Sequence, residues 1–313
     1  DEVKRIRTIH RRMGTRKLYE ILEPFMLEHG IKMGRDGLFE VLRINGLLIR
    51  KTKKATITTN SKHLYRKYKN LIKGYVPAGA NHIWVSDLTY WKVDKGFYYV
   101  SLITDAYSRK IVGYEVAMDL ESIHSINALN KAILSLDKHR PASYPLIHHS
   151  DRGIQYCCHG YVNKLLKNNI HISMTESGDP LDNAIAERVN GILKNEYLIY
   201  KKPKNLQEAK FILSEAVDTY NKTRPHLSLG MLKPEFVHQY QDIKIENLWN
   251  KKLKNKNQSF SHWVTGCTLI FPGKESQDHR HAHAHTHKHT HAHSHIHTQA
   301  QARARTVLWQ VEC

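Results

Sequence analysis

The chain has 313 residues, of which 41% are hydrophobic and 25% charged, which is enough apolar material for one large domain or two modest ones. No apolar run approaches the 18 or more residues of a membrane span, and no secretory signal pattern opens the chain. The four cysteines, two of them adjacent, form neither a disulfide framework nor a zinc-ribbon spacing. We therefore expect a soluble protein of a reducing compartment, with no membrane partner.

The net charge of +19 is unevenly distributed along the chain. Residues 1–75 hold 19 Lys and Arg against 7 acidic residues. A basic block at one end of a soluble chain favours a polyanionic partner, nucleic acid first. The alternative is a basic surface that is merely solvated.

Residues 1–50 are predicted to form a small helical DNA-binding unit. The chain begins at Asp1 without an initiating Met, so we expect this unit to be truncated at its start. Apolar residues at helical spacing predict one helix that stops near Gly30 and a second that ends at the turn Asn45-Gly46. The pair is similar to part of a helix-turn-helix reader, with four basic residues as candidate DNA contacts: Arg16, Lys17, Arg35 and Arg43. A helical hairpin that only packs on the next domain is the alternative.

Residues 51–80 are basic, polar and weakly periodic, which predicts a linker that can lie along phosphates. Lys53 and Lys54 are its candidate DNA contacts.

Residues 81–240 carry the pattern of a mixed α/β domain. β-Branched and aromatic runs predict strands over 83–93, 97–104 and 110–116, the first two joined by a short turn. A helix over 121–138, a strand over 146–149, a helix over 161–168 and a strand over 170–174 follow, and helices over 182–200 and 206–220 complete the domain. This order is that of a ribonuclease-H-like fold, a mixed sheet with flanking helices.

Residues 241–313 are predicted to be a C-terminal extension. Histidine occupies every second position from His279 to His297, a pattern that builds no core. We expect a disordered tail that is not native to the fold and that binds metal ions only opportunistically.

Three carboxylates are the candidate catalytic residues. Asp87 lies inside an apolar strand, where a carboxylate is costly unless it is paired or binds a metal. Asp151 directly follows a predicted strand, and Glu187 lies on a predicted helix, with 35 residues between the two. Three converging oxygen donors suit Mg²⁺ or Mn²⁺, and two such ions can support in-line phosphoryl transfer. Taken singly, a carboxylate in such a position is more often a turn or surface residue. Asp105 competes with Asp87 for the first catalytic position, and we interpret it as a turn or cap residue.

Five ordered blocks resemble the integrase core of bacterial insertion-sequence transposases. They are WVSDLTY at 84–90, TDAYSRKIVG at 104–113, HHSDRGIQY at 148–156, DNAIAER at 182–188 and YNKTRPHLSL at 220–229. The pattern is that of the second reading frame, OrfB, of elements related to retroviral integrases, and it covers about residues 10–240.

The resemblance implies that Asp87, Asp151 and Glu187 are the family's DDE triad, with its 35-residue spacing, on a ribonuclease-H-like fold. It implies two Mg²⁺ (or Mn²⁺) ions and no covalent protein–DNA intermediate: water attacks a phosphodiester at the element end, and the freed 3′-hydroxyl attacks another. The partners it implies are double-stranded DNA (terminal inverted repeats and target), further copies of the chain on that DNA, and a first-frame OrfA protein. The implied location is the bacterial cytoplasm, in association with the nucleoid.

Helix geometry adds residues near the triad. Asn190, Gly191 and Lys194 share a helix face with Glu187, so Asn190 and Lys194 are candidate contacts to DNA. Gly191 has no side chain and would let another backbone approach closely. Arg152 is a further candidate phosphate contact. The vicinal pair at 148 and 149 points to opposite faces of a strand, and we expect neither histidine to bind metal.

The sequence thus predicts a DNA transposase that cleaves strands and joins them. One rival is a non-catalytic, DNA-binding remnant that occupies element ends. A weaker rival is a ribonuclease-H-type hydrolase of RNA–DNA hybrids, which leaves the basic N-terminal region unexplained.

Overall fold

The computed structural model describes residues 1–49, 63–94, 96–136, 144–176 and 183–240. These residues all belong to one structural unit, residues 1–261. Lys53 and Lys54 lie outside the described residues, as does the whole predicted C-terminal extension with its His-rich tract.

The N-terminal region contains three helices, α1 (Glu2–Ile9), α2 (Thr15–Glu28) and α3 (Arg35–Ile44). Gly30 and Gly46 follow α2 and α3 at φ near +65°, the left-handed conformation that commonly ends a helix. One apolar side of each helix is buried in a shared cluster: Ile6, Leu18, Leu22, Met26, Leu38 and Leu42. Helical periodicity therefore predicts α2 and α3 correctly, and the region has a small core of its own.

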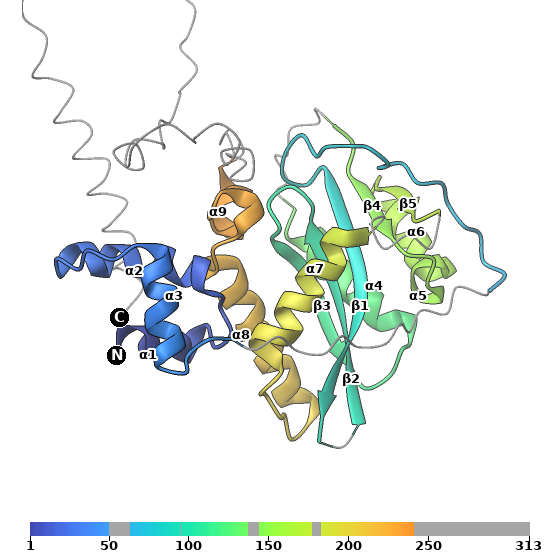
Figure 1. The fold of residues 1–313 in the computed structure, drawn as a ribbon. Coiled ribbons are helices and arrows are strands. Elements are labelled where there is room, and N and C mark those ends of the chain that lie inside the picture. The colour runs from blue at the N-terminus through green and yellow to red at the C-terminus, as the bar shows by residue number, and fades with distance from the viewer. Residues whose placement is uncertain (50–62, 95, 137–143, 177–182, 241–313) are drawn as a thin grey trace, which may run out of the picture. The chain divides into compact units, whose positions relative to one another are not determined.

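A five-stranded mixed sheet forms the centre of the molecule (Figure 1). The strands are β1 (Ile83–Val93), β2 (Gly96–Asp105), β3 (Ile111–Ala117), β4 (Ile147–Ser150) and β5 (His171–Met174), in the order β3-β2-β1-β4-β5. The first three pair antiparallel, whereas β4 is parallel to β1 and β5 is parallel to β4. This order, with helices on both faces, is the predicted ribonuclease-H-like arrangement.

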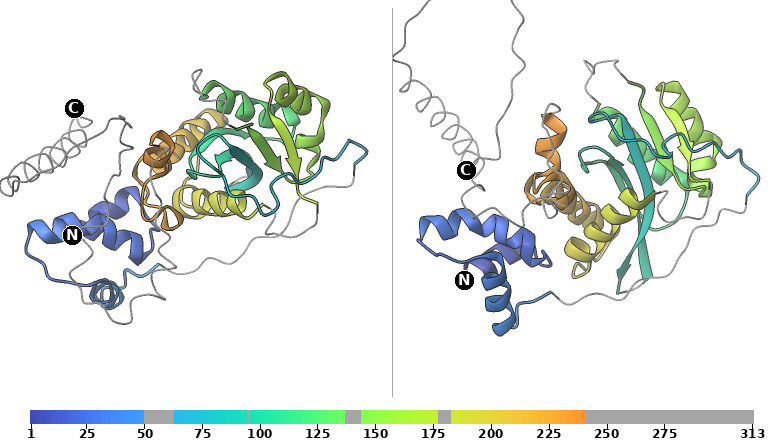
Figure 2. Two further views of the ribbon diagram at one scale, coloured as in Figure 1. Left: turned by 90° about the horizontal axis from the view of Figure 1, so that it is seen from above. Right: turned by 45° about the horizontal axis from the view of Figure 1, so that its top comes forward.

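Two helical layers cover the sheet (Figure 2). On one face α4 (Ser122–Leu134), α5 (Ile154–Cys157) and α6 (His159–Lys167) bury an apolar cluster against the strands. On the other face α7 (Ala184–Ile192), the π-helical segment η2 (Leu193–Leu198) and α8 (Leu206–Thr223) bury a second one. A short helix η3 (Leu227–Leu229) and α9 (Pro234–Gln239) follow α8. No described helix is long and apolar enough to cross a membrane.

The N-terminal helices contact the helices on the α7 side of the sheet. His10, at the end of α1, places Nδ1 3.1 Å from the Tyr197 hydroxyl and Nε2 3.2 Å from Thr223 Oγ1. Arg12 donates a hydrogen bond to the hydroxyl of Tyr200 at 3.0 Å. These contacts hold α1 and the start of α2 beside η2 and α8.

Residues 63–80 have no helix or strand but do contact the core. The backbone N–H of Leu71 donates to Ser173 Oγ at 2.8 Å, and that of Met174 donates to the carbonyl of Lys69 at 3.3 Å. Tyr65 and Tyr68 pack against the cluster under α4 and α6. The described part of the predicted linker therefore runs along β5; its contact with DNA phosphates stays a prediction.

The structure departs from the predicted elements mainly at short or irregular segments. The sequence does not predict α1, α5 and α9, which have between four and eight residues each. The helix predicted over 182–200 is α-helical only to Ile192 and continues as η2. Short helices have too few turns to give a periodic signal in the sequence. A π-helical segment differs from an α-helix in its backbone hydrogen bonds, and the spacing of apolar residues does not reveal that difference.

Candidate active site

Asp87 lies on the face of β1 that is covered by α7. Side chains alternate along a strand, so Val85, Asp87, Thr89 and Trp91 share this face. Val85 belongs to a buried cluster with Ala186, and the Trp91 indole N–H donates to the carbonyl of Leu198 at 3.1 Å. Asp87 is the charged residue in this otherwise apolar and neutral row, as the sequence indicates.

Parallel pairing brings Asp151 beside Asp87. Ser86 of β1 is opposite Ser150 of β4, and the next residue of each strand is an aspartate. The backbone N–H of Gly153 donates to Asp151 Oδ1 at 3.0 Å, which orients this carboxylate at the carboxyl end of β4. This register brings the two aspartates close together.

Helix α7 runs along β1 and carries Glu187 in its first turn. Asn183, the residue before the helix, donates from Nδ2 to the carbonyl of Ser86 at 3.0 Å. Asn190 donates from Nδ2 to Asp87 Oδ2 at 2.7 Å, and Lys194 Nζ donates to Thr89 Oγ1 at 3.3 Å. Residues at intervals of three or four share one helix face, so these contacts turn the Glu187 side of α7 toward β1.

The spacing of these contacts has a simple geometric origin. Successive residues on the shared face of β1 are two apart, a rise of about 6.6 Å. Their counterparts on the helical segment, at 186, 190, 194 and 198, are four apart, a rise of about 6 Å in an α-helix. The two repeats nearly match along α7, so one face of this helix follows β1; the contacts at 194 and 198 belong to the π-helical η2.

Burial and like charge disfavour the ionised form of Asp87. The pKa of Asp87 is raised to about 7, chiefly by burial and next by the charge of Asp151; Glu187 contributes in the same direction. Hydrogen bonds from Asn190 and the Leu88 N–H act in the opposite direction. Asp151 and Glu187 are thus both close enough to Asp87 to disfavour its negative charge.

The donor set fits a divalent cation, which would relieve that repulsion. The side-chain Oδ1 of Asn190, beside Asp87, is buried without a hydrogen-bond partner, which leaves an oxygen at this end of the site unused. Within the described residues, no three acidic, His or Cys side chains form a ready-made metal cluster. Mg²⁺ is commonly held by one or two carboxylates together with water and substrate phosphates, so such a cluster is not required.

The two histidines before Asp151 are buried structural residues. His148 Nε2 lies 2.6 Å from Ser86 Oγ and 2.9 Å from the Tyr161 hydroxyl, under the α4 and α6 layer. His149 Nδ1 lies 2.8 Å from Ser173 Oγ of β5. Burial lowers the pKa of His148 to about 3, so this imidazole is neutral at pH 7. The structure gives both rings partners inside the protein; that neither binds metal stays a prediction.

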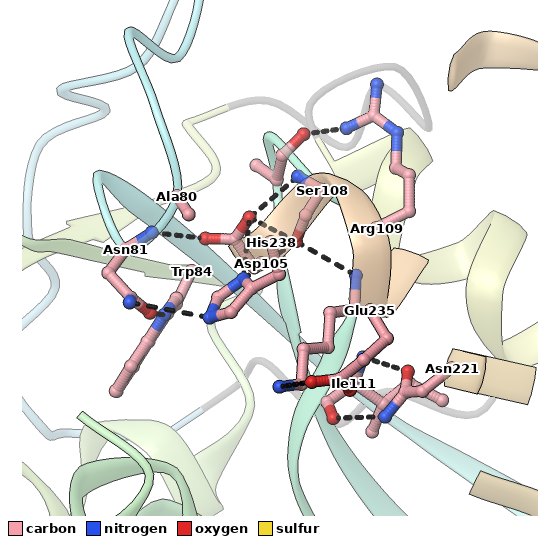
Figure 3. Close-up of polar contacts among 12 residues, drawn as sticks. Ala80, Asn81, Trp84, Asp105, Ser108, Arg109, Ile111, Asn221, Glu235 and His238 are labelled. Atoms are coloured by element: carbon pink, nitrogen blue, oxygen red, sulfur yellow. Dashed lines mark hydrogen bonds and ion pairs between the residues drawn. The ribbon is translucent and has the colours of Figure 1, made fainter. Parts of the chain in front are cut away.

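Asp105 fixes the turn after β2 (Figure 3). Its carboxylate is fully buried and accepts hydrogen bonds from the Asn81 N–H at 2.7 Å and from both the N–H and hydroxyl of Ser108 at 2.7 Å. His238 of α9 approaches Ser108 Oγ at 3.0 Å and so joins α9 to this turn. Asp105 is therefore a turn and cap residue, as predicted.

The predicted DNA contacts differ in their surroundings. Arg16 is exposed, Arg35 pairs with Asp36, and Arg43 pairs with Glu40 on the surface of α3. The carbonyl of Arg152 lies 2.8 Å from His63 Nε2, and its own side chain is half-buried. Asn190 and Lys194 share the face of Glu187 as predicted, but their side chains contact Asp87 and Thr89. DNA binding by these residues stays a prediction.

Sequence reasoning missed Asn183, Arg188 and Glu196. Asn183 lies four residues before Glu187 on the same helix face, a spacing that points to it in hindsight. Glu196 accepts two hydrogen bonds of 2.8 Å from Arg224, which is fully buried. No sequence signal connects residues 28 positions apart in this way. Lys17 and Arg188 line a basic cavity described below.

Comparison with known proteins places this site in a family. The family Integrase core domain matches residues 77–180 and, in a second form, residues 168–234. The insertion element IS600 uncharacterized 31 kDa protein of Shigella sonnei is 34% identical over 71% of this chain and 79% of its own length. The transposase for insertion sequence element IS629 of the same organism is 31% identical over 72% and 73%.

Among solved structures, the HTLV-2 integrase catalytic core domain in complex with magnesium is 23% identical, with a TM-score of 0.39 over 51% of this chain and 97% of that one. The matched core segments contain all three candidate carboxylates, and the relatives match over more than two thirds of their length. The chain belongs to the IS3 family of insertion-sequence transposases and is a polynucleotidyl transferase with an integrase catalytic core.

Proposed function

We propose that this transposase cleaves and joins DNA strands at the ends of its insertion element in a Mg²⁺-dependent reaction, with Asp87, Asp151 and Glu187 as its catalytic carboxylates. The observation that carries the proposal is the register of β1 and β4, which sets Asp87 and Asp151 side by side under the helix of Glu187. The integrase-core family supplies the reaction class.

The chain's own residues supply position and charge. Asp87, Asp151 and Glu187 would hold Mg²⁺ or Mn²⁺, with two ions as the proposed number. When bound, such ions activate an attacking water or 3′-hydroxyl and stabilise the departing oxygen of an in-line displacement. Asn190 and the Leu88 N–H each donate to one oxygen of Asp87 and fix the orientation of its carboxylate. Gly153 does the same for Asp151.

The proposed sequence of events contains no covalent protein–DNA intermediate. Water first attacks a phosphodiester at the element end and releases a 3′-hydroxyl. That hydroxyl then attacks a phosphodiester of the target, so each step exchanges one P–O bond for another. Further copies of the chain and an OrfA protein are proposed partners on the DNA.

The test uses the full chain with Asp151→Asn. An end-labelled duplex that carries the element's terminal repeat is incubated with Mg²⁺ and analysed for nicking and strand transfer. We expect the variant to lose cleavage while its duplex affinity stays nearly unchanged, because the amide keeps the shape of the side chain but loses its charge. The exposed Asp218→Asn is the matched control and should cleave like the parent chain.

The outcomes separate the three candidate functions. Cleavage by Asp151→Asn above a few per cent of the parent rate contradicts the proposed site. A parent chain that binds the repeat but never cuts it is the non-catalytic remnant. Cleavage of RNA–DNA hybrids without any need for terminal sequence would favour the ribonuclease-H-type hydrolase.

A further inference from the structure

A basic cavity lies on a face of α7 next to the one that carries Glu187. Its volume is about 290 Å³. Four separate segments line it: α2, the turn between β2 and β3, α7, and the residues after α8. The polar residues that they contribute are Lys17, Arg109, Arg188, Arg224, His226 and Ser228. The cavity thus joins the N-terminal helices to the catalytic core.

Most of the positive charge in this cavity is unbalanced. Arg224 is neutralised by Glu196, with which it forms a buried ion pair at 2.8 Å. Among the described residues, no acidic side chain forms an ion pair with Lys17, Arg109 or Arg188. Arg188 is exposed, which opens the cavity to solvent at that side.

His226 lines the cavity and has a buried ring nitrogen without a hydrogen-bond partner. Its side chain is 6% exposed, its Nδ1 lies 3.0 Å from Ser228 Oγ, and its Nε2 is buried with no hydrogen-bond partner. Arg109 Nε donates to Ser228 Oγ at 3.4 Å, which leaves the Ser228 hydroxyl proton for Nδ1 of His226. In that tautomer Nε2 carries the hydrogen. Such a buried N–H calls for an acceptor.

The electrostatics of the cavity favour an anion as that acceptor. Burial first, and then the charge of Arg224, lower the pKa of Lys17 to about 8; Glu196 acts in the opposite direction, and Arg188 adds a smaller lowering. Burial first, and then the charges of Arg224, Arg109, Lys17 and Arg188, lower the pKa of His226 to about 2, so its ring is neutral at pH 7. A group with negative charge would relieve the repulsion among the cations and accept from His226.

We propose that this cavity binds one phosphate of the DNA backbone and so fixes the position of the duplex relative to the carboxylates. The proposal rests on DNA being the substrate, as in the proposed function. A phosphodiester suits the cavity because Lys17 belongs to the N-terminal helices and Arg188 directly follows Glu187. One phosphate held between them sets the register of the DNA in the site without reading its sequence.

The test compares two double variants of the full chain. Lys17→Gln/Arg188→Gln removes two cavity cations. Lys164→Gln/Lys167→Gln is the control: both lysines lie on α6, which leads into the start of β5 and therefore toward the end of the sheet opposite Asp151. The affinity for a terminal-repeat duplex is measured from 50 to 200 mM salt in EDTA, so that cleavage plays no part.

We expect the cavity variant to lose one phosphate contact. Its log–log salt slope should be shallower by about 0.9, so its affinity falls about 3.5-fold less than that of the parent chain between the two salt concentrations. The α6 control should keep the parent slope. The single variant Arg188→Gln should change the slope in the same direction. Because Arg188 is exposed, this change cannot be attributed to a folding defect.

Thermal unfolding distinguishes a binding site from a structural cluster. Removing Lys17 and Arg188 should leave the melting temperature unchanged or raise it, because like charges are separated. Inorganic phosphate should stabilise the parent chain more than chloride at equal ionic strength, and this difference should shrink in the cavity variant. A lower melting temperature with an unchanged slope would mean that these cations support the fold and would overturn the proposal.

Two further results would overturn it. An unchanged slope together with lost phosphate protection would mean a site for small anions only. Equal slope changes in the cavity and α6 variants would mean general surface charge. A failure of the proposed function looks different: Asp151→Asn would keep cleaving, while the EDTA binding experiment would be unaffected.

Discussion

Two glycines have opposite surroundings, and each shows what a single added methyl group would do. Gly113 of β3 lies where α4 crosses the sheet: a Cβ there would be 2.3 Å from the carbonyl oxygen of Ala128 and 2.9 Å from the Cβ of Ala132. Gly191 lies on α7, and a Cβ there would have no neighbour within 4 Å. The first glycine allows two layers to pack; the second leaves open space beside the candidate site.

We predict that Gly113→Ala destabilises the fold. Neither close atom belongs to a flexible side chain, so α4 must move from the sheet, at a cost of about 1–3 kcal/mol. Gly191→Ala is the matched control and should stabilise α7 by up to about 1 kcal/mol through helix propensity. Denaturant unfolding of the full chain measures both changes. Equal effects of the two substitutions would contradict the role given to Gly113.

At the scale of elements, one buried ion pair holds η2 against the end of α8, in the helical layer that also contains α7. Arg224, at the end of α8, is fully buried, and its only acidic partner among the described residues is Glu196 of η2. The pair joins two elements that are separate in the chain. A buried guanidinium without its carboxylate keeps its desolvation cost and loses the compensating attraction.

We predict that Glu196→Gln lowers the free energy of unfolding by about 3–5 kcal/mol. The double variant Glu196→Leu/Arg224→Met should lose much less, because it removes both charges and keeps most of the volume. Asp218→Asn breaks an exposed pair with Lys222 within α8 and should cost less than about 0.5 kcal/mol. Urea unfolding ranks the three variants. A double variant as unstable as Glu196→Gln would argue that packing, not charge, holds η2 against α8.

The elements that position the site follow from sequence periodicity, whereas several of its contacts do not. A run of β-branched and aromatic residues predicts the strand of Asp87, and the helical repeat places Asn190 and Lys194 on the face of Glu187. That Asn190 donates to Asp87 depends on the tilt of α7 over β1, which no local pattern encodes. The basic cavity combines residues 17, 109, 188 and 226 from four segments, and only tertiary packing brings them together.

For the whole molecule, buried neutral histidines set the response to acid. Burial lowers the pKa values of His10, His148 and His226 to about 4, 3 and 2, from an ordinary value of 6.5. Between those values and 6.5 the unfolded chain binds more protons than the folded one, so stability decreases as pH falls. Asp87 acts oppositely: its raised pKa, about 7, makes the folded chain the better proton acceptor between 7 and the ordinary 3.8. As pH falls, the three histidines therefore lower the stability of the folded chain, and Asp87 raises it.

We therefore predict that the full chain loses stability as pH falls from 6.5 to 5, before most carboxylates titrate. Each histidine contributes about 1.4 kcal/mol per pH unit once the pH is well below 6.5, and Asp87 cancels about one of the three. Melting temperatures recorded from pH 7.5 to 5 measure the slope. His10→Gln, which keeps a polar side chain between Tyr197 and Thr223, should make the slope shallower, whereas the exposed His171→Gln should leave it unchanged. A parent chain whose melting temperature is level across this window would show that these rings are protonated while folded, and that the contacts of His10 with η2 and α8 tolerate its charge.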